Sequence, residues 1–363
     1  PGTVNDAFFR FVVDMGGPGP DKGKGGKYLI VGPGQITPAN TDGYFVANTP
    51  SKINWLILRG FLDDEGKTDT ARNAFRGGLK VYPYALRANP PANNFKNLTD
   101  WETNTIHANN FKFYEELDEV IQREPSELFS PELLGMASSI GIEKGKPFNP
   151  SPEQKALLTE AVAIGNATAR SILFGPKDPK NYIYPGKAGY WQTGFPGGSH
   201  EYLVNQGNGG RDMDGRTLFF YLATVNTPAM ALEIPGVGSQ YAFSSRDGSG
   251  AYLNGSNTYK LNIPANPPAQ KFWSFVVYDP QTRAMLQSED MPYPSKNNKR
   301  NTDMIKNADG SIDLYFGPQA PVGMEANWVK TVSGKGWFGI FRLYGPGQEW
   351  FDRTWKLGDI EKV

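Results

Sequence analysis

The sequence predicts an α+β multidomain protein that is mainly β, and three observations carry this prediction. The chain has 363 residues, and a single hydrophobic core stops growing at about 250–300 residues, so we expect two or three domains. It holds 42 Gly and 29 Pro with 13% aromatic residues, a composition typical of short strands joined by tight turns. In its middle, the spacing of apolar residues becomes helical, with strand-like segments on both sides.

The N-terminal part, residues 1–96, is expected to form short strands. Alternating apolar residues bounded by Gly and Pro are typical of strands, and a Gly pair after a polar-capped segment is typical of a helix end. The expected elements are strands at 27–31, 43–46 and 79–83, the last at a sheet edge, a helix at 68–75, and either a strand or a short helix at 51–61.

The middle part, residues 97–180, is expected to be helical. In residues 111–123, Phe113, Leu117 and Ile121 fall on one helical face. A second helix is expected from Pro131. Ser151-Pro152-Glu153 is a strong helix start, and Phe174-Gly175-Pro176 is a stop signal, so a long helix is expected between them.

The C-terminal part, residues 181–363, returns to strand-like alternation. Several short strands separated by turns indicate a sandwich or jelly roll. The expected strands are at 261–263, 272–278, 311–316 and 337–344, and the segment 213–224 is the helical exception.

Long phrases of the chain resemble a known pair of domains. The C-terminal phrases resemble the DUF1214 domain: FWSFVVYDPQTRAML (272–286), NADGSIDLYFGPQAPVGMEANWV (307–329) and GWFGIFRLYGPGQEWFDRTWKLGDIEKV (336–363). The earlier phrases resemble the DUF1254 domain and its helical insert: GPDKGKGGKYLIVGPG (19–34), NWLILRGF (54–61), NTIHANNFKFYEEL (104–117), IGIEKGKPFNP (140–150) and GNATAR (165–170).

This resemblance implies an immunoglobulin-like sandwich, a small helical domain and a C-terminal jelly roll. It also implies a bacterial periplasmic or secreted setting, because many members carry secretion signals. Members have more chain before the segment that matches residues 8–11, so we expect the first sandwich to be incomplete at its N-terminus. An incomplete sheet exposes strand edges, which favours a homo-oligomer. The resemblance supplies no catalytic residue.

Composition excludes several function classes. Lys plus Arg equals Asp plus Glu at 37 each, so we expect no nucleic-acid partner, because phosphate neutralisation needs a basic surplus. The chain has no Cys, which removes disulfides, Cys–zinc sites and iron–sulfur clusters. No apolar run reaches the ~20 residues of a transmembrane helix. We expect no cofactor.

Metal and triad chemistry find little support. The two histidines, His107 and His200, lie in different modules at no ligand spacing, and a metal site would need both to converge with an acid such as Glu201 or Glu233, so we predict no metal site. Side chains adjacent in sequence, such as Ser199, His200 and Glu201, do not make a triad. The acidic residues Glu115, Glu116, Asp118 and Glu119 lie on one helix, and Glu115 and Glu119 share a side that is more typical of a solvated face than of a glycosidase pair. The Gly/Lys-rich segment 23–27 is a turn or, alternatively, an anion nest.

Aromatic residues in loops are the strongest binding signal. Trp191 and Tyr190 precede Gln192-Thr193-Gly194, a context in which strand burial does not account for them. Such rings stack on sugars and other planar or apolar ligands. We therefore predict that Tyr190 and Trp191 bind a small molecule or carbohydrate.

Three functions remain open. The first is an extracytoplasmic ligand-binding or assembly module. The second is a hydrolase-type enzyme with a site at a domain junction, where pockets are common. The third is a structural subunit of a homo-oligomer. The residues that the enzyme hypothesis selects are Trp191 and the catalytic candidates His107, Glu116, Arg170, Tyr221 and Glu233.

Overall fold

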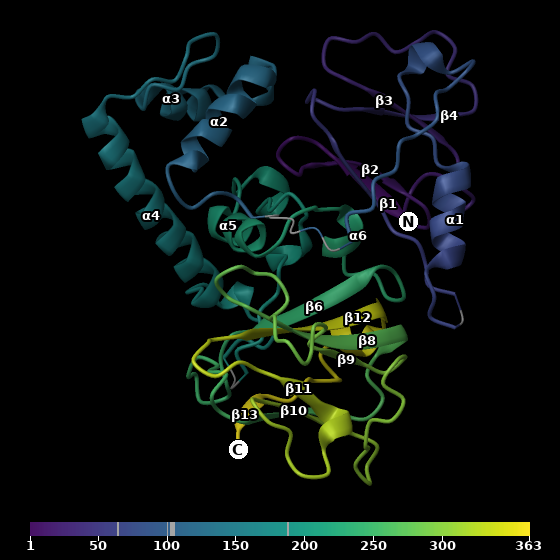
Figure 1. The fold of residues 1–363 in the computed structure, drawn as a ribbon, viewed down its shortest axis with the longest axis vertical. Helices are drawn as coiled ribbons and strands as arrows, with labels where there is room; N and C mark the ends of the chain where they lie inside the picture. Colours follow the sequence, from purple (N-terminus) through teal and green to yellow (C-terminus); the bar gives the residue numbers. More distant parts are fainter. Residues whose placement is uncertain (64, 100, 102–105, 187–188) are drawn as a thin grey trace. The chain divides into compact units, whose positions relative to one another are not determined.

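The computed structural model describes residues 1–63, 65–99, 101, 106–186 and 189–363. The chain forms two compact units (Figure 1): one holds residues 1–159 and 225–227, and the other holds 160–224 and 228–363. The expectation of an α+β multidomain fold built mainly on sheets is confirmed. The domain boundaries at 96 and 180 stay a prediction. Along the sequence, the boundary between the two units falls inside helix α4 (Pro152–Phe174), after residue 159.

The first unit contains two small sheets. One is antiparallel, with strand order β2-β1-β5, and the other is the parallel pair β3-β4. The strands are β1 (Gly2–Asn5), β2 (Phe11–Met15), β3 (Lys27–Val31), β4 (Tyr44–Asn48) and β5 (Trp55–Leu58). The predicted strands at 27–31 and 43–46 are confirmed, and the ambiguous segment 51–61 contains a strand.

The predicted edge strand at 79–83 is wrong. The Leu79 N–H donates to the Phe75 carbonyl and ends helix α1 (Asp69–Gly78). The Asn93 amide then takes the backbone groups that a neighbouring strand would need: its Nδ2 donates to Leu79 O at 2.8 Å and its Oδ1 accepts from Val81 N at 3.2 Å. A side chain therefore replaces the sheet partner here.

The helices of this unit follow the predicted periodicity. Helix α2 (Lys112–Arg123) buries Tyr114 and Ile121, whereas Glu115 and Glu119 are exposed, as expected of a solvated acidic side. Lys144 Nζ donates to the carbonyls of residues 121, 122 and 124, so a cation stabilises the negative end of this helix. Helix α3 (Pro131–Ser139) is capped by the hydroxyl of Ser130.

The Gly/Lys-rich turn at 23–27 is closed around one carboxylate. Asp21 is 6% exposed and accepts hydrogen bonds from Gly16 N at 2.7 Å, Gly25 N at 2.9 Å and the Tyr28 hydroxyl at 2.7 Å. The Gly25 N–H, at the centre of the segment that could form an anion nest, is thus used by the protein itself, which favours the turn interpretation.

The second unit is built on two packed four-stranded sheets (Figure 1). All pairings are antiparallel except β10 with β11. In sheet order, the strands are β11 (Trp328–Lys330), β10 (Ile312–Gly317), β7 (Tyr259–Ile263) and β13 (Ile360–Lys362) in one sheet, and β6 (Ser239–Ser244), β12 (Phe338–Pro346), β8 (Ala269–Tyr278) and β9 (Ser295–Asn297) in the other. The predicted C-terminal sandwich is confirmed.

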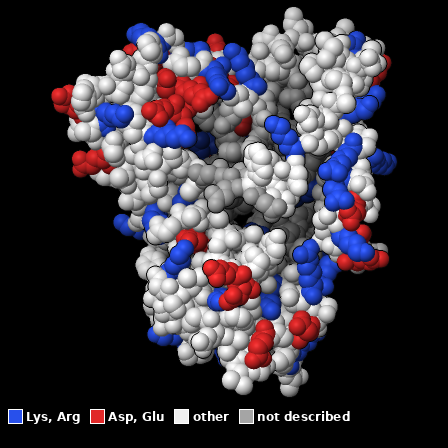
Figure 2. Space-filling model, viewed as in Figure 1, with Lys and Arg blue, Asp and Glu red and all other residues white. Residues whose placement is uncertain are grey.

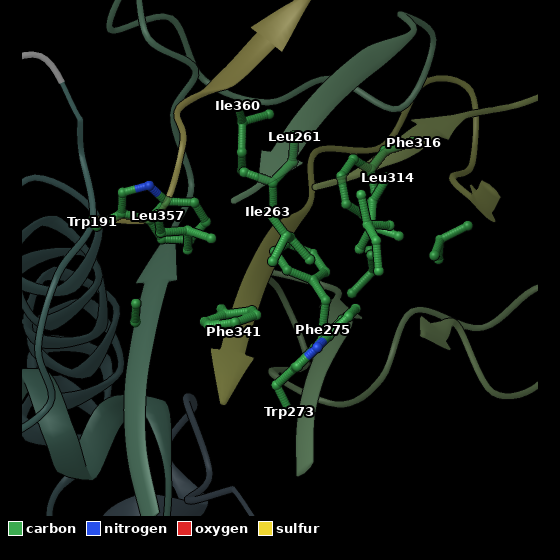
Figure 3. Close-up of a cluster of buried hydrophobic side chains, with 14 of the residues drawn as sticks. Trp191, Leu261, Ile263, Trp273, Phe275, Leu314, Phe316, Phe341, Leu357 and Ile360 are labelled. Carbon is green, nitrogen blue, oxygen red and sulfur yellow. The ribbon is translucent and has the colours of Figure 1, made fainter. Parts of the chain in front are cut away.

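Aromatic side chains fill the space between these sheets (Figure 3). Trp273 and Phe275 of β8 and Phe341 of β12 meet Leu261 and Phe316 of the opposite sheet, and all are buried. The Phe275 and Phe316 ring centroids are 4.8 Å apart. Burial of rings of this size supplies most of the stability of such a core.

Helices cover the other face of the β6-β12-β8-β9 sheet. Leu173 and Phe174 of α4 and Leu218 of α5 (Met213–Leu222) pack against Phe338 and Ile340 of β12. The short helices α6 (Pro228–Ala231) and α7 (Gln348–Phe351) complete the unit. The predicted helix at 213–224 and the long helix ending at Phe174 are confirmed.

No helix in the described residues is long and apolar enough to cross a bilayer. On the face shown in Figure 2, basic and acidic side chains are both present, in line with the zero net charge.

The Asp21 contacts predict an acid-dependent stability. Burial would raise the pKa of Asp21, but the hydrogen bonds from Tyr28, Gly16 and Gly25 outweigh it and hold that pKa below its ordinary value. We expect Asp21→Asn to lower the unfolding free energy by about 2 kcal/mol at neutral pH. The difference is complete above about pH 4 and is lost as the pH falls through the folded-state pKa.

Thermal unfolding of both proteins across pH measures this difference. Asp42→Asn is the matched control, because Asp42 lies exposed nearby and its carboxylate bonds to no described residue. A gap between wild type and Asp21→Asn that persists unchanged at pH 2 would contradict the assignment.

Candidate ligand site

A cluster of aromatic rings around one arginine is the best-formed candidate site of the second unit. We call it the Arg246 site, and it consists of Tyr182, Tyr190, Gln192, Arg246 and Tyr252. Its residues come from the segment that follows α4 and from the loop that follows β6.

A tight turn places Arg246 opposite Tyr252. Strand β6 ends at Ser244, and the buried Asp247 then organises the turn: its Oδ1 accepts from Ser249 N at 3.0 Å, Ser249 Oγ at 2.6 Å and Ala251 N at 3.0 Å. An isolated antiparallel bridge joins Arg246 to Tyr252. The chain therefore reverses within a few residues and sets the two side chains beside each other.

Gly250 is required at the base of this turn. Its φ of +91° lies in the left-handed region, which side chains rarely adopt. A Cβ atom at this position would lie 2.6 Å from the Tyr190 hydroxyl oxygen. Glycine thus allows Tyr190 to lie directly against the turn.

The Arg246 guanidinium lies between two tyrosine rings. Its Cζ is 4.4 Å from the Tyr252 ring centroid and 5.6 Å from that of Tyr190. Nη2 donates to the Tyr252 hydroxyl at 2.8 Å and Nη1 to Gly250 O at 3.4 Å, whereas the buried Nε has no hydrogen-bond partner. Among the residues that the structure describes, no carboxylate forms an ion pair with Arg246.

Tyr182 and Gln192 form the inner side of the site. The Tyr182 ring meets that of Tyr190 edge to face at 6.4 Å, and its hydroxyl donates to Pro176 O at 3.0 Å. Burial raises the pKa of Tyr182 although Arg246 lowers it, so the hydroxyl stays protonated. Gln192 is buried, and its Oε1 has no hydrogen-bond partner.

This arrangement combines an accessible ring with hydrogen-bond donors. Tyr252 is 58% exposed and offers a face for stacking, while the guanidinium beside it is a planar donor set without a protein counter-ion. In the described part of the chain, no three His, Asp or Glu side chains are placed to hold a metal ion. The chemistry that the cluster supports is recognition of a ring that carries oxygen substituents.

Two known protein families match separate regions of the chain. Residues 1–83 match "Protein of unknown function (DUF1254)" and residues 238–348 match "Protein of unknown function (DUF1214)". The chain belongs to the DUF1254/DUF1214 family. Arg246, Gly250 and Tyr252 lie inside the DUF1214 region, whereas Tyr182 and Tyr190 lie between the two matched regions.

One solved structure shows the fold of this DUF1254/DUF1214 chain. The VPA0106 protein from Vibrio parahaemolyticus aligns with a TM-score of 0.52 and 17% identity, covering 100% of this chain and 81% of that chain. An uncharacterized protein from Burkholderia cenocepacia aligns with a TM-score of 0.27 and 15% identity, covering 64% of this chain and 48% of that chain. No curated protein matches the chain.

The two aromatic residues predicted to bind a ligand have different surroundings. Tyr190 belongs to the Arg246 site, but Trp191 is 1% exposed and packs edge to face on Phe275 (Figure 3). Its Nε1 donates to Gly358 O at 2.9 Å. The expectation that a loop position leaves Trp191 outside the core is wrong, because successive side chains of an extended segment point to opposite sides. Its role in ligand binding stays a prediction.

The catalytic candidates are spread over both units. In the first unit, His107 is exposed, and its ring meets that of Phe113 edge to face, with the centroids 6.3 Å apart. Glu116 Oε1 lies 3.7 Å from Lys112 Nζ in an ion pair. In the second unit, Glu233 is exposed after α6, and His200 is half-buried.

Burial lowers the pKa of His200, although Glu201 raises it. The structure brings together only Arg170 and Tyr221 among these candidates of the second unit, where both approach Arg283. Their catalytic roles stay predictions.

Sequence reasoning missed Arg246, Gly250 and Tyr252. The available signal was Arg246-Asp247-Gly248-Ser249-Gly250, a Gly-rich turn with an Asx-forming residue, followed two residues later by Tyr252. The stacking partner Tyr190 lies more than fifty residues away in the chain, so the pairing itself left no local pattern.

Trp191 predicts a large stability effect. We expect Trp191→Ala to lower the unfolding free energy of the DUF1214-containing unit by about 3–5 kcal/mol, because it opens a cavity in the core and leaves Gly358 O without its donor. Chemical denaturation measures the loss. Trp191→Phe retains most of the ring volume and should cost less, so equal behaviour of the two variants would contradict the core assignment.

Gly250 predicts a local steric effect. Gly250→Ala introduces backbone strain and a collision with the Tyr190 hydroxyl, so we expect a lower melting temperature. Gly323→Ala is the matched control, because Gly323 has a φ of +76° with no atom within 4 Å of its Cβ position. Equal losses in the two variants would show that Tyr190 does not lie against Gly250.

Proposed function

We propose that this chain is an extracytoplasmic ligand-binding module that holds a saccharide, or another small ring compound bearing oxygen substituents, at the Arg246 site. The observation that carries the proposal is the Arg246 guanidinium lying between the rings of Tyr190 and Tyr252. Rings and a planar donor set held in one place are what a sugar needs, because its C–H face stacks and its oxygens accept hydrogen bonds.

The charge of the site favours an acidic saccharide over a neutral one. Arg246 has no carboxylate partner among the described residues, and its Nε has no acceptor. A ligand carboxylate would form a charge-assisted hydrogen bond with the guanidinium, which is stronger than the bond that a sugar hydroxyl makes.

Location and assembly complete the proposal. A periplasmic or secreted location is supported by the family resemblance, whose members commonly carry secretion signals. Assembly into a homo-oligomer is supported by the open sheets of the sandwich, whose outer strands β6, β9, β11 and β13 each have a strand partner on one side only.

Calorimetric titration with glucuronate and glucose, as acidic and neutral probes, tests the site. We expect Tyr252→Ala to weaken binding about tenfold through loss of stacking, with little change in melting temperature because this ring is mostly exposed. Tyr293→Ala is the matched control, since Tyr293 is 74% exposed in the same unit. It should bind like wild type.

Two outcomes would overturn the proposal. Equal binding by Tyr252→Ala and wild type would place the ligand elsewhere on the chain. No binding by wild type to acidic or neutral monosaccharides, or to their oligosaccharides, would contradict ring recognition at the Arg246 site.

A further inference from the structure

Two arginines of the second unit are held by one loop. Arg170 lies on α4, and Arg283 lies in the loop that follows β8. Arg170 Nη1 donates to Pro280 O at 2.8 Å and to Gln281 Oε1 at 3.1 Å, and Arg283 Nη1 donates to Gln281 O at 3.2 Å. Gln281 therefore binds both guanidinium groups, one through its side chain and one through its backbone.

The ring of Tyr221, which lies on α5, packs against the Arg283 guanidinium. The Arg283 Cζ is 4.0 Å from the Tyr221 ring centroid, a stacked arrangement. The Tyr221 hydroxyl donates to Asn166 Oδ1 at 3.0 Å, which connects α5 to α4. The Arg283 side chain is thus placed by two helices as well as by its own loop.

The loop keeps Arg283 in an unfavourable backbone conformation. Its φ of +57° lies in the left-handed region. Two backbone hydrogen bonds hold it there: Arg283 N donates to Asp279 O at 2.8 Å, and Asp279 N donates to Ala284 O at 2.9 Å. Strain of this kind persists where the surroundings impose it, and it is concentrated at functional sites.

The protein supplies no negative charge to this pair. In the part of the chain that the structure describes, neither arginine forms an ion pair. Asp279 is engaged elsewhere, since its Oδ1 accepts from Gln281 N at 2.7 Å and its Oδ2 lies 3.2 Å from Lys335 Nζ. Burial and the positive charge of Arg170 lower the pKa of Arg283, while Tyr221 raises it.

A purely structural role accounts for Arg170 better than for Arg283. The hydrogen bonds of Arg170 connect α4 to the loop, whereas the Arg283 guanidinium donates a hydrogen bond only within its own loop, and its buried Nε has no acceptor. The two positive charges repel each other, and the Arg283 Nε–H has no acceptor, so both features destabilise the folded state. A bound anion would offset the charge repulsion and could accept a hydrogen bond.

We propose that Arg170 and Arg283 form a binding site for the oxyanion group, phosphate or carboxylate, of a small molecule. Planar guanidinium groups present paired N–H donors that match the oxygens of either group. Gln281 orients both donors. This site is independent of the Arg246 site, since the two share no residue.

The test is titration of the full chain with inorganic phosphate and with succinate, at constant ionic strength set by potassium chloride. We expect wild type to bind at least one of them and to gain melting temperature from it, because a ligand that binds the folded state stabilises that state. Arg283→Gln should weaken binding about tenfold or more, through loss of one charged donor pair. Which probe binds identifies the anion class.

Arg300→Gln is the matched control. Arg300 is exposed in the same unit, so this variant removes an equal charge without touching the site. It should bind like wild type, and so should Tyr252→Ala, which alters only the Arg246 site. Equal weakening in Arg300→Gln and Arg283→Gln would reduce the effect to net charge and overturn the proposal.

Folding of the variant is checked separately. Arg283→Gln should unfold at or above the wild-type temperature in phosphate-free buffer, because like-charge repulsion is relieved. If it does not fold, Gln281→Ala removes the side chain that orients Arg170, keeps the charge, and should also weaken binding. Failure of wild type to bind either probe above the chloride baseline would overturn the oxyanion site.

Discussion

Burial of strand β12 on both faces is the constraint on which the second unit depends. One side of the strand contributes Phe341 and Leu343 to the core between the sheets, and the other contributes Phe338 and Ile340 to the contact with α4 and α5. Gly339 makes the packing possible, because a Cβ there would lie 2.2 Å from the Phe275 ring. Hydrogen-bonded pairing with β6 and β8 then fixes the positions of these two strands beside β12.

The two faces of this central sheet have different consequences. The inner face is mostly apolar, and its rings form most of the core between the sheets. The outer face is covered by helices. In this part of the unit, several arginine side chains lie against tyrosine rings. Arg246, Arg283 and Arg342 each stack on tyrosine, and each has a buried Nε without an acceptor. Contacts between a cation and a ring contribute about 0.5–2 kcal/mol each.

The sequence predicted those helices whose ends and apolar spacing are encoded by neighbouring residues. The helix of residues 152–174 was recognisable from its Ser-Pro-Glu start and its Gly-Pro end, and helix 112–123 from the spacing of its apolar residues. The segment 79–83 was misassigned because the Asn93 amide occupies the backbone groups of that segment, and this contact leaves no periodic trace. Trp191 was predicted to lie outside the core because it occurs in a loop-like sequence, and its neighbour Gln192 pairs with other segments through isolated bridges only.

The sequence by itself determined the class of fold, the main helices and strands, and the absence of cysteine chemistry. These follow from composition and from the spacing of neighbouring residues. Only the tertiary structure decided which side chains meet: Tyr190 with Arg246, Tyr221 with Arg283, and Arg170 with Gln281. Such contacts join residues some fifty to more than a hundred positions apart, and they depend on sheet pairing and helix packing that no local pattern encodes.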